Sequence, residues 1–336
     1  MTIKIQDIAY HLPEQVLEND VLKNISPDWD MNIVEERVGV MRRHIARADE
    51  TALDLALEAC KKLFSRHNQV KELIDAIIFC SQSQDYIMPP NACILHKNLE
   101  LNENVLAFDF NLACSGYIYG LVLSEGLICS KRAKNILLIN ADTYSKYVSD
   151  KDRSVKVLFG DGAAVSWITK SSDKDGLIDI QCSTYGKLYE RFIIPAGGCR
   201  MPKSEKTSLP ITDKSGNIRT LENIYMDGMG ILTFVNSRVP KQINEILTRN
   251  KLTIDDIDLF IFHQASKLAL DRLKNSLNIK DEKLFTNLST IGNTVSASIP
   301  IALKEALEKK IIKKGDKVVL SGFGVGLSWG SAILKI

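Results

Sequence analysis

Asp75-Ala76-Ile77-Ile78-Phe79-Cys80 (DAIIFC) returns, in altered form, as Asp258-Leu259-Phe260-Ile261-Phe262-His263 (DLFIFH), 183 residues further along the chain. Both stretches are apolar runs without polar alternation, which is typical of strands buried on both faces of a parallel sheet. At the same separation of 183 residues, Lys134-Asn135-Ile136-Leu137 corresponds to Lys317-Val318-Val319-Leu320. Two matches at one separation indicate a duplicated βα architecture.

Stretches with helical periodicity lie between these strand-like runs. Residues 51–65, 117–130, 239–249 and 299–310 carry apolar side chains three or four positions apart, as a helix packed on a sheet requires. Strands that alternate with helices of this length predict parallel β-α-β units. The expected fold class is therefore α/β, with two similar halves.

The segment between the halves has a different composition. Residues 195–223 (PAGGCRMPKSEKTSLPITDKSGNIRTLEN) are rich in Gly, Pro, Ser, Lys and Thr and have little apolar periodicity. A core-like segment follows directly, so we expect a long surface excursion rather than a disordered linker. The predicted division is an N-terminal half over residues 1–170, a connecting segment over 171–225, and a C-terminal half over 226–336.

Composition excludes several classes of protein. The 336 residues suffice for two domains or one large α/β body. Lys and Arg number 43 against 41 for Asp and Glu, and this balance argues against nucleic acid as a partner. The longest apolar runs are far too short to span a membrane, and the first ten residues lack the pattern of an export signal. We expect a cytoplasmic protein.

Cysteine and histidine usage points away from disulfides and metals. The seven cysteines are scattered and no two form a C-x-x-C pair, so neither a disulfide scaffold nor a structural zinc site is expected. The five histidines are equally dispersed. The chemistry must therefore depend on single residues, and no metal ion or other cofactor is expected.

Cys114 is the first candidate. It follows the apolar residues 105–110 and directly precedes the amphipathic residues 117–130, which predicts a thiol at a helix N-terminus. The helix dipole and free backbone N–H groups there favour the thiolate, which is the nucleophilic form. The alternative is an ordinary buried cysteine.

Two more candidates lie in the second half. His263 ends the predicted strand at residues 259–262, where α/β proteins place reactive side chains, but it could also be a hydrogen-bonded core histidine. Asn293, in Gly292-Asn293-Thr294, precedes a helix and could equally be a turn or cap residue. The glycine-rich residues 321–330 lack the G-x-G-x-x-G spacing and fit a backbone that approaches a ligand closely.

Cys, His and Asn in this order, each in its local motif, resemble the β-ketoacyl-acyl carrier protein synthase III family of thiolase-fold condensing enzymes. The resemblance extends over nearly the whole chain and implies a layered α-β-α-β-α body of two similar βα halves. It also implies a homodimer. The motifs that carry it are Arg37-Val38-Gly39-Val40, Ala113-Cys114-Ser115-Gly116, Phe159-Gly160-Asp161-Gly162-Ala163, His263-Gln264-Ala265, Gly292-Asn293-Thr294 and Gly326-Leu327-Ser328-Trp329-Gly330.

The resemblance assigns a role to each candidate. Cys114 would attack an acyl thioester, delivered on coenzyme A or on acyl carrier protein, and hold the acyl group covalently. A malonyl-acyl carrier protein would then lose carbon dioxide, and His263 and Asn293 would donate hydrogen bonds to the enolate oxygen. The backbone N–H groups of Cys114 and Val325 would form the oxyanion hole for the condensation. The family needs no metal or redox cofactor.

The resemblance also suggests residues that bind the substrates, and here the chain departs from the family. The suggested residues for coenzyme A, pantetheine and acyl chain are Arg37, Arg153, Met88, Ser266 and Phe323. Ser266 stands where the family has an asparagine, and Leu268 where it has an arginine associated with carrier-protein docking. The residues at the catalytic positions are those of the family, whereas some positions that contact coenzyme A or pantetheine carry other residues. This pattern suggests a specialised member of the family.

Two further functions are compatible with the same residues. A non-elongating acyltransferase would pass the acyl group from Cys114 to an oxygen or nitrogen nucleophile. A non-catalytic acyl-binding protein is the third possibility, and the presence of Cys114, His263 and Asn293 together argues against it. The retention of Asn293 favours condensation, because simple transfer forms no enolate.

Overall fold

Two five-stranded mixed sheets form the body of the protein, and the computed structural model describes residues 2–171 and 175–336 of the chain. In the first sheet the strand order is β5-β4-β6-β7-β1. Strand β4 pairs in parallel with β5 and β6, whereas β7 is antiparallel to both β6 and β1. The bounds are β1 Ile3–His11, β4 Ala76–Cys80, β5 Leu106–Phe110, β6 Asn135–Asp142 and β7 Gly162–Lys170.

The second sheet repeats this arrangement in the order β14-β13-β15-β16-β8. Strand β13 is parallel to β14 and β15, and β16 is antiparallel to β15 and β8. The prediction of two similar halves is thus confirmed, and β8 lies in the segment that the sequence suggested as a connection. The bounds are β8 Gly176–Thr184, β13 Leu259–Phe262, β14 Leu284–Phe285, β15 Lys317–Gly324 and β16 Ser328–Lys335.

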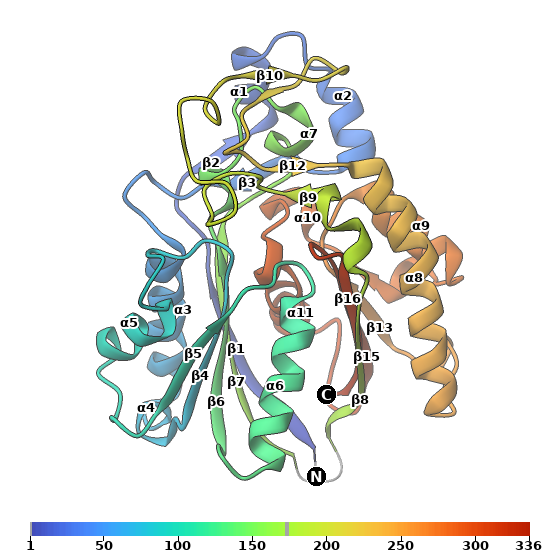
Figure 1. Ribbon diagram of the computed structural model, residues 1–336. Coiled ribbons are helices and arrows are strands. Elements are labelled where there is room, and N and C mark those ends of the chain that lie inside the picture. The colour runs from blue at the N-terminus through green and yellow to red at the C-terminus, as the bar shows by residue number, and fades with distance from the viewer. Residues whose placement is uncertain (1, 172–174) are drawn as a thin grey trace.

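Helices cover both outer faces and fill the space between the sheets, which gives the predicted α-β-α-β-α layers (Figure 1). Helices α3 and α5 cover the first sheet, α6 and α11 lie between the sheets, and α8 covers the second sheet beside α9. Helix α8 begins well before the predicted residue 239, because its glycines and Pro240 obscure the period. The bounds are α3 Ala52–Arg66, α5 Asn91–Asn98, α6 Gly116–Cys129, α8 Gly228–Arg249, α9 Lys267–Ser276 and α11 Ser298–Glu308.

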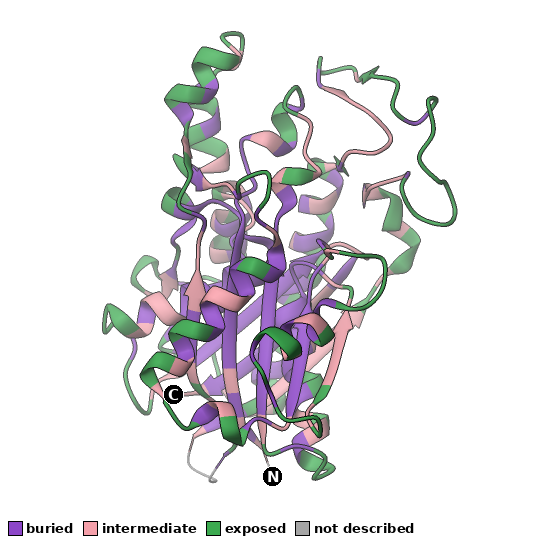
Figure 2. Ribbon diagram, turned by 90° about the vertical axis from the view of Figure 1, so that its left-hand side faces the viewer, coloured by how far each residue is buried: buried purple, intermediate pink, exposed green. Residues whose placement is uncertain are grey.

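The parallel strands are apolar throughout because both of their faces are covered. In β4, Ile77 and Phe79 belong to the core under α3, whereas Ile78 packs against the central helix α6. Strand β6 alternates in the same way between Leu137 and Leu138. Figure 2 shows the resulting column of buried strands inside a shell of partly exposed helices. This double burial is the physical reason for the unbroken apolar runs.

The acidic residue that opens each repeated stretch has a structural purpose. The Asp75 carboxylate accepts hydrogen bonds from the backbone N–H groups of Lys134 (2.8 Å) and Asn135 (3.0 Å), at the start of the neighbouring strand. In the second half, Asp258 accepts from the N–H of Lys317 at 2.8 Å. The repetition in sequence therefore reflects a repeated contact between adjacent strand ends.

Short elements form a cap above the carboxyl ends of the parallel strands (Figure 1). The excursion at residues 195–223 belongs to this cap and contains the two-stranded ribbon β10–β11. The cap and the remaining turns contain α1 Asn19–Ile25, α2 Met31–Ile33, η1 Val34–Val38, β2 Val16–Glu18, β3 Arg42–His44, α4 Val70–Leu73, η2 Tyr144–Lys146, α7 Arg153–Lys156, η3 Gly186–Arg191, β9 Phe192–Ile193, β10 Ile211–Thr212, β11 Ile218–Arg219, β12 Tyr225–Met226, η4 Asp281–Lys283, α10 Leu288–Ile291 and η5 Val295–Ala297.

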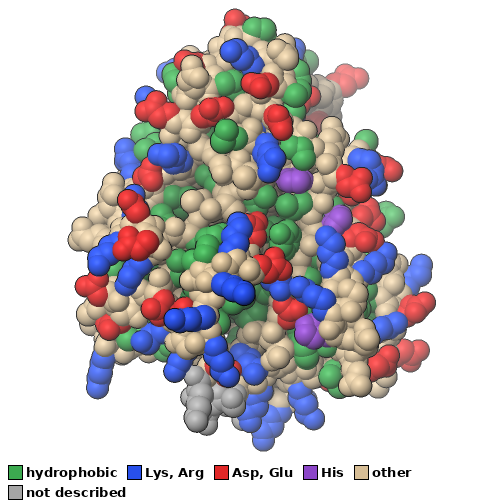
Figure 3. Space-filling model, turned by 180° about the vertical axis from the view of Figure 1, so that it is seen from behind, with side chains coloured by type: hydrophobic (Ala, Val, Ile, Leu, Met, Phe, Trp, Pro, Cys, Tyr) green, Lys and Arg blue, Asp and Glu red, His purple; other side chains and the backbone are tan. Residues whose placement is uncertain are grey.

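The surface is mixed in charge. On the face seen in Figure 3, basic and acidic side chains are interspersed, in keeping with the net charge of +2. Among the described residues, no helix is both long and apolar enough to cross a membrane.

Candidate active site

A pocket of about 510 Å³ brings together the three residues singled out for chemistry. Cys114 comes from the loop between β5 and α6, His263 follows β13, and Asn293 lies between α10 and α11. All three line the pocket, and each is at most 3% exposed. Both halves of the duplicated fold therefore contribute to one site.

Strand β15 lies directly against Cys114, and glycines make this approach possible. A Cβ atom on Gly324 would lie 2.9 Å from the Cys114 sulfur, and one on Gly322 would lie 2.5 Å from the Cys114 carbonyl oxygen. Any larger side chain would push the strand away from the thiol. The glycine-rich tail thus brings main chain close to a reactive atom, as its composition suggested.

The Cys114 thiol is not activated in the way the sequence suggested. Burial raises the pKa of Cys114, and the nearby Asp142 carboxylate raises it further. The backbone N–H groups of Cys114 and Val325 hydrogen-bond to the sulfur and lower its pKa, without offsetting the burial. The expectation that the position before α6 favours the thiolate is therefore wrong here, because loss of hydration outweighs the helix terminus. The same two N–H groups can bind an oxyanion formed beside the sulfur.

His263 is held by its Nδ1 atom, which lies 2.7 Å from the Ser298 hydroxyl. That hydroxyl also lies 3.0 Å from the Val295 carbonyl oxygen and has only one proton to donate. When it donates to Val295, His263 Nδ1 carries the ring proton and Nε2 is an acceptor. When it donates to Nδ1 instead, Nε2 carries the proton and is a donor. Ser298 can therefore support either tautomer.

Burial also keeps the imidazole neutral. It lowers the pKa of His263 to about 3, while a hydrogen bond with the Val295 backbone opposes this shift. The ring lies edge-on to Phe323, with ring centroids 5.7 Å apart. A neutral imidazole at ordinary pH can exchange donor and acceptor roles through its tautomers.

Asn293 faces the same point in the pocket. Its Nδ2 atom lies 3.4 Å from His263 Nε2 and 3.5 Å from the Ala265 carbonyl oxygen. Its Oδ1 atom accepts a hydrogen bond from the Val295 N–H at 2.9 Å. Asn293 is thus both a turn residue and a pocket residue, and its amide N–H groups converge with the His263 ring.

The loop that carries Asn293 is joined to the first half by main-chain hydrogen bonds. The Asn293 N–H donates to the Leu158 carbonyl, and the Gly160 N–H donates to the Asn293 carbonyl, each at 3.0 Å. Beneath this junction lies Arg43, which is fully buried. A Cβ atom on Gly292 would lie 2.9 Å from the Arg43 Cβ, so only glycine fits there.

Arg43 is bound by main-chain and amide oxygens rather than by a carboxylate. Its guanidinium donates to the carbonyls of Leu17 (3.1 Å) and Val157 (2.8 Å) and to Asn19 Oδ1 (2.8 Å). Burial lowers the pKa of Arg43 to about 10, so the group stays charged at neutral pH. It fastens the N-terminal segment to the floor of the site.

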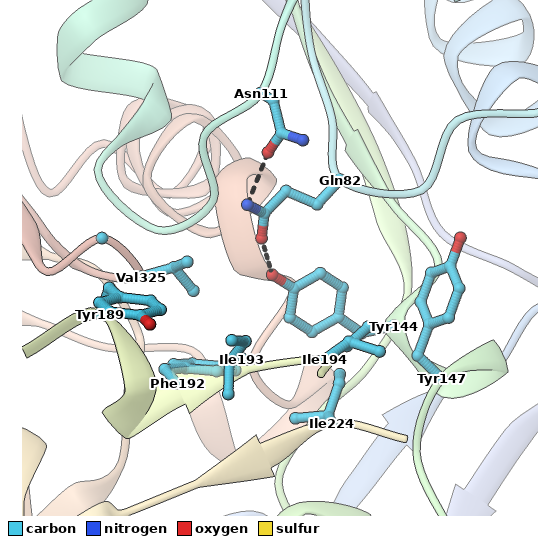
Figure 4. A pocket seen from close by; sticks show the side chains of 11 residues that line it. Gln82, Asn111, Tyr144, Tyr147, Tyr189, Phe192, Ile193, Ile194, Ile224 and Val325 are labelled. Atoms are coloured by element: carbon cyan, nitrogen blue, oxygen red, sulfur yellow. Dashed lines mark hydrogen bonds between the residues drawn. The ribbon is translucent and has the colours of Figure 1, made fainter. Parts of the chain in front are cut away.

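A second pocket, of about 360 Å³, is lined in part by Val325 (Figure 4). Phe192 lines both pockets, and the N–H of Val325 reaches the Cys114 thiol. One wall carries Gln82, Asn111 and Tyr144, which the sequence analysis did not single out. No sequence motif marks these three residues, since they are single polar residues on three separate segments of the chain. The other lining residues are Tyr147, Tyr189, Ile193, Ile194, Ile224 and Gly326.

The structure brings only some of the suggested substrate-binding residues to the large pocket. Arg37, Ser266 and Phe323 line it, and Ser266 also caps α9 by accepting from the Ala269 N–H at 3.3 Å. Arg153 and Met88 are not among the described residues that line either pocket. Met88 is 79% exposed.

The mouth of the large pocket is built partly by the excursion, which the sequence analysis treated as surface only. Arg219 pairs with Asp152 at 2.8 Å and with Asp213 at 3.0 Å, and its guanidinium lies 4.8 Å from the centre of the Tyr225 ring. Asp152 is fully buried at the start of α7. These contacts fix the β10–β11 ribbon over the pocket.

Within the described ranges 2–171 and 175–336, no group of three or more His, Cys, Asp or Glu side chains is placed so that it could hold a metal ion. The chemistry that the arrangement offers is nucleophilic attack by a thiol beside two backbone N–H donors. Opposite them, an imidazole and an amide converge on one point.

Comparisons with known proteins identify relatives of this chain. The family described as 3-Oxoacyl-[acyl-carrier-protein (ACP)] synthase III matches residues 108–186, and its C-terminal counterpart matches residues 247–336. The chain is 38% identical to a Beta-ketoacyl-[acyl-carrier-protein] synthase III of Campylobacter concisus, over 98% of this chain and 95% of that relative.

Solved structures give the same result. A crystal structure of a 3-oxoacyl-(acyl-carrier-protein) synthase III has a TM-score of 0.96 and 38% identity, with both chains covered completely. The corresponding synthase from Aquifex aeolicus has a TM-score of 0.84 and 33% identity, over 99% of this chain and all of that one.

Proposed function

Because this chain belongs to the 3-oxoacyl-[acyl-carrier-protein] synthase III family, we propose that it condenses a starter acyl group, held on Cys114, with malonyl-acyl carrier protein. The observation that carries the proposal is the single pocket that unites Cys114 with His263 and Asn293. The thiol has two backbone N–H donors on one side, and the imidazole and the amide converge nearby. Such an arrangement suits a transferase of the condensing type.

Loading of the starter needs a proton acceptor, because the Cys114 pKa is raised. In the tautomer with the ring proton on Nδ1, His263 Nε2 can accept the thiol proton as the sulfur attacks the acyl thioester. The new carbon–sulfur bond forms as the thiol of coenzyme A or of the carrier protein leaves, and that thiol takes up the proton. The N–H groups of Cys114 and Val325 stabilise the oxyanion in between.

Condensation uses the other tautomer. The bond between the malonyl carbon and its carboxylate breaks, carbon dioxide leaves, and the electron pair passes to the thioester as an enolate. His263 Nε2–H and the Asn293 amide donate hydrogen bonds to the enolate oxygen. The enolate carbon then attacks the acyl-cysteine, the carbon–sulfur bond breaks as the β-ketoacyl product forms, and the Cys114 sulfur leaves as a thiolate that takes up a proton from solvent. No metal or redox cofactor takes part.

The large pocket would receive the pantetheine arm of either substrate. Arg37 and Ser266 are the proposed contacts, with Phe323 beside His263. We place Arg153 near the entrance rather than inside, since it is exposed while its neighbour Ser154 lines the pocket. We place the reaction in the cytoplasm.

We also propose a homodimer. The loop before α5 exposes apolar side chains, with Ile87 98% exposed and Met88 79% exposed. Isolated chains rarely leave consecutive apolar residues in water. A second copy of the chain would cover them, and Met88 would then lie near the acyl group of the partner.

Simple acyl transfer without elongation is not favoured. The relatives that match over the full length are named as ketoacyl synthases, and Asn293 is retained where an enolate would need it. An acyltransferase to an alcohol or amine would use Cys114 alone for covalent chemistry and would have little use for that amide.

The test is the intact mass of the full-length protein after incubation with acyl thioesters, and again after addition of malonyl-acyl carrier protein. We expect an adduct on Cys114 that disappears as a β-keto product forms. An adduct that persists with malonyl-carrier protein but is discharged by an alcohol or amine would instead indicate simple transfer.

The variant Asn293→Ala separates the two half-reactions. It should leave loading of Cys114 within about threefold, while condensation falls by roughly 100- to 1000-fold, the usual cost of one oxyanion donor. Cys93→Ala is a suitable control, because Cys93 is exposed and is not among the described residues that line either pocket. Equal loss in both half-reactions would contradict the assignment of Asn293.

A further inference from the structure

We propose that the second pocket (Figure 4) selects a starter acyl group that carries a hydroxyl or similar oxygen function, rather than a plain hydrocarbon chain. This inference rests on the proposed function, because it concerns the acyl group that Cys114 would receive. The side chains of Gln82, Asn111 and Tyr144 form one polar wall of this pocket, and their hydrogen-bonding groups indicate the class of acyl group that it would bind.

The wall is a continuous chain of hydrogen bonds. The Tyr144 hydroxyl donates to Gln82 Oε1 at 2.5 Å, and Gln82 Nε2 donates to Asn111 Oδ1 at 2.7 Å. Figure 4 shows the three side chains stacked in this order along one side of the pocket. The segments that follow β4, β5 and β6 supply one residue each, so the order of neighbouring strands brings them together.

Contacts outside the wall hold two of its members, Gln82 and Tyr144, in place. The backbone N–H of Gln82 donates to Asp142 Oδ1 at 2.8 Å. The Tyr144 ring is 3% exposed and packs edge-on against Phe159 and Phe192, with centroids 5.1 and 6.4 Å apart. Tyr144 and the main chain of Gln82 are therefore preformed parts of the site, whereas Asn111 is exposed.

The chain leaves hydrogen-bonding capacity on the pocket side. Each amide nitrogen has two protons, and Gln82 Nε2 uses one of them on Asn111. The Tyr144 oxygen has donated its proton to Gln82 and can still accept. A substrate hydroxyl can donate to Tyr144 and accept from Gln82 at the same time, since it is both donor and acceptor.

A hydrocarbon chain would satisfy neither group. It would displace water from the spare N–H and the spare oxygen and return no hydrogen bond, which is the basis on which polar pockets reject apolar analogues. The opposite wall, with Phe192, Ile193 and Ile224, is apolar. The pocket thus suits a short acyl chain that is apolar on one side and oxygenated on the other.

The pocket also lies where the acyl group must go. Val325, whose N–H reaches the Cys114 sulfur, forms part of its lining. Asn111 lies three positions before Cys114 on the same loop. An acyl group on Cys114 that turned away from the pantetheine pocket would meet this wall.

The experiment compares loading rates of the full-length protein with pairs of coenzyme A thioesters in which a hydroxyl replaces a methyl group. Suitable pairs are 3-hydroxybutanoyl with 3-methylbutanoyl, 4-hydroxybutanoyl with pentanoyl, and 5-hydroxypentanoyl with hexanoyl. The readout is the rate of adduct formation on Cys114 by intact mass. We expect at least one hydroxylated member to load about tenfold or more faster than its partner.

Three variants locate the preference. Tyr144→Phe and Gln82→Leu should each reduce the ratio of the preferred pair by about tenfold, because each removes one contact for the hydroxyl. Asn111→Leu should reduce it less, and this residue is exposed, so the substitution does not endanger the fold. Tyr119→Phe is the matched control, since that hydroxyl bonds to Ser183 and Thr184 away from the pocket.

Ratios near one for all pairs, with adducts forming on Cys114, would overturn the selection of an oxygenated starter and leave the proposed function intact. If all three variants kept the preference for the hydroxylated thioester, the proposal would also be overturned, because the polar wall would not be the cause of that preference. No adduct on Cys114 with any thioester would overturn this inference and the proposed function together.

Discussion

The two halves of the molecule share one strand order and differ at the positions that line the site. At the separation of 183 residues that relates the two halves, the counterpart of Cys80 is His263, that of Cys114 is Ala297, and that of Ser115 is Ser298. The thiol that the first half presents thus has no counterpart in the second half. The imidazole has none in the first, where the equivalent Cys80 donates instead to the Leu112 carbonyl at 2.9 Å.

The contacts that build the sheets have changed less than those that face the pocket. Asp75 and Asp258 still hold the neighbouring strand in the same manner. Around the two pockets, one half supplies the Cys114 thiol and the polar wall, and the other supplies the imidazole and amide. The difference teaches that duplication provided the scaffold, while the residues that line the site were divided between the copies.

The largest effect should come from comparing the two buried thiols. Cys114→Ala removes the proposed nucleophile, so acyl loading should fall by about 10⁴-fold or more. Cys80→Ala should keep loading within a few-fold and lower the free energy of unfolding by roughly 1–2 kcal/mol, because a buried group and its hydrogen bond are lost. Intact mass measures acyl loading, and urea denaturation measures the free energy of unfolding. Abolished loading in Cys80→Ala would contradict the expected difference between the two thiols.

The pH dependence of stability should differ in sign between the halves. In the first, burial raises the pKa of Asp142 to about 7, so its contribution to stability is complete below about pH 4 and is lost as the pH rises towards 7. In the second, the lowered pKa of His263, about 3, means that stability is lost as the pH falls from about 6.5. Each effect amounts to about 1.4 kcal/mol per pH unit, and they oppose one another between pH 4 and 6.5.

Asp142→Asn should remove the contribution of Asp142 that opposes the contribution of His263. The free energy of unfolding of this variant should increase with pH, relative to the wild type, between about pH 4.5 and 6.5. Urea denaturation at several pH values provides the measurement. Parallel curves for the two proteins would show that Asp142 does not titrate in this range.

The equivalent serines provide a sharper comparison. Ser298→Ala removes the partner of His263 Nδ1 and with it the control of the tautomer, so condensation should fall by roughly 10- to 100-fold. Ser115→Ala removes only a hydroxyl that pairs with Ser328 at 2.7 Å and should leave the condensation rate within a few-fold. The pH profile of malonyl decarboxylation distinguishes tautomer control from a purely structural role, and an unchanged rate in Ser298→Ala would rule out that control.

The smallest effect concerns the repeated acidic residues. Asp75→Ala should lower the free energy of unfolding by about 1–2 kcal/mol, and Asp258→Ala by about 1 kcal/mol, because Asp75 accepts two backbone hydrogen bonds and Asp258 one. Neither should change the loading rate. A larger loss in Asp258→Ala than in Asp75→Ala would contradict the hydrogen-bond count.

Much of the fold could be predicted because its signals are local. The parallel strands are apolar on both faces, and α3, α6 and α11 begin and end within a few residues of the periodic stretches. Strand β8 was missed because only its first two residues are buried and the rest are partly or fully exposed, so it has no unbroken apolar run. Helix α8 was shortened in the prediction because glycines near its start interrupt the apolar period.

The site was predictable only where one residue stands in a distinctive motif. Cys114, His263 and Asn293 each have such a context, and the structure brings them to one pocket. Gln82 and Tyr144 have none, since their partnership depends on the order of strands in the sheet. The raised pKa of Cys114 was not foreseeable either, because the cost of burial depends on the packing around the sulfur.

The junction between Asn293 and the first half has a consequence for amide hydrogen exchange. The N–H groups of Asn293 and Gly160 donate across the halves, above the buried Arg43. Local fraying of the loop would have to break these bonds and expose the arginine, so exchange at both amides should require global opening. Deuterium uptake at the amides of Asn293 and Gly160 would therefore report the separation of the two halves. The pocket, which residues of both halves line, would be lost in the same event.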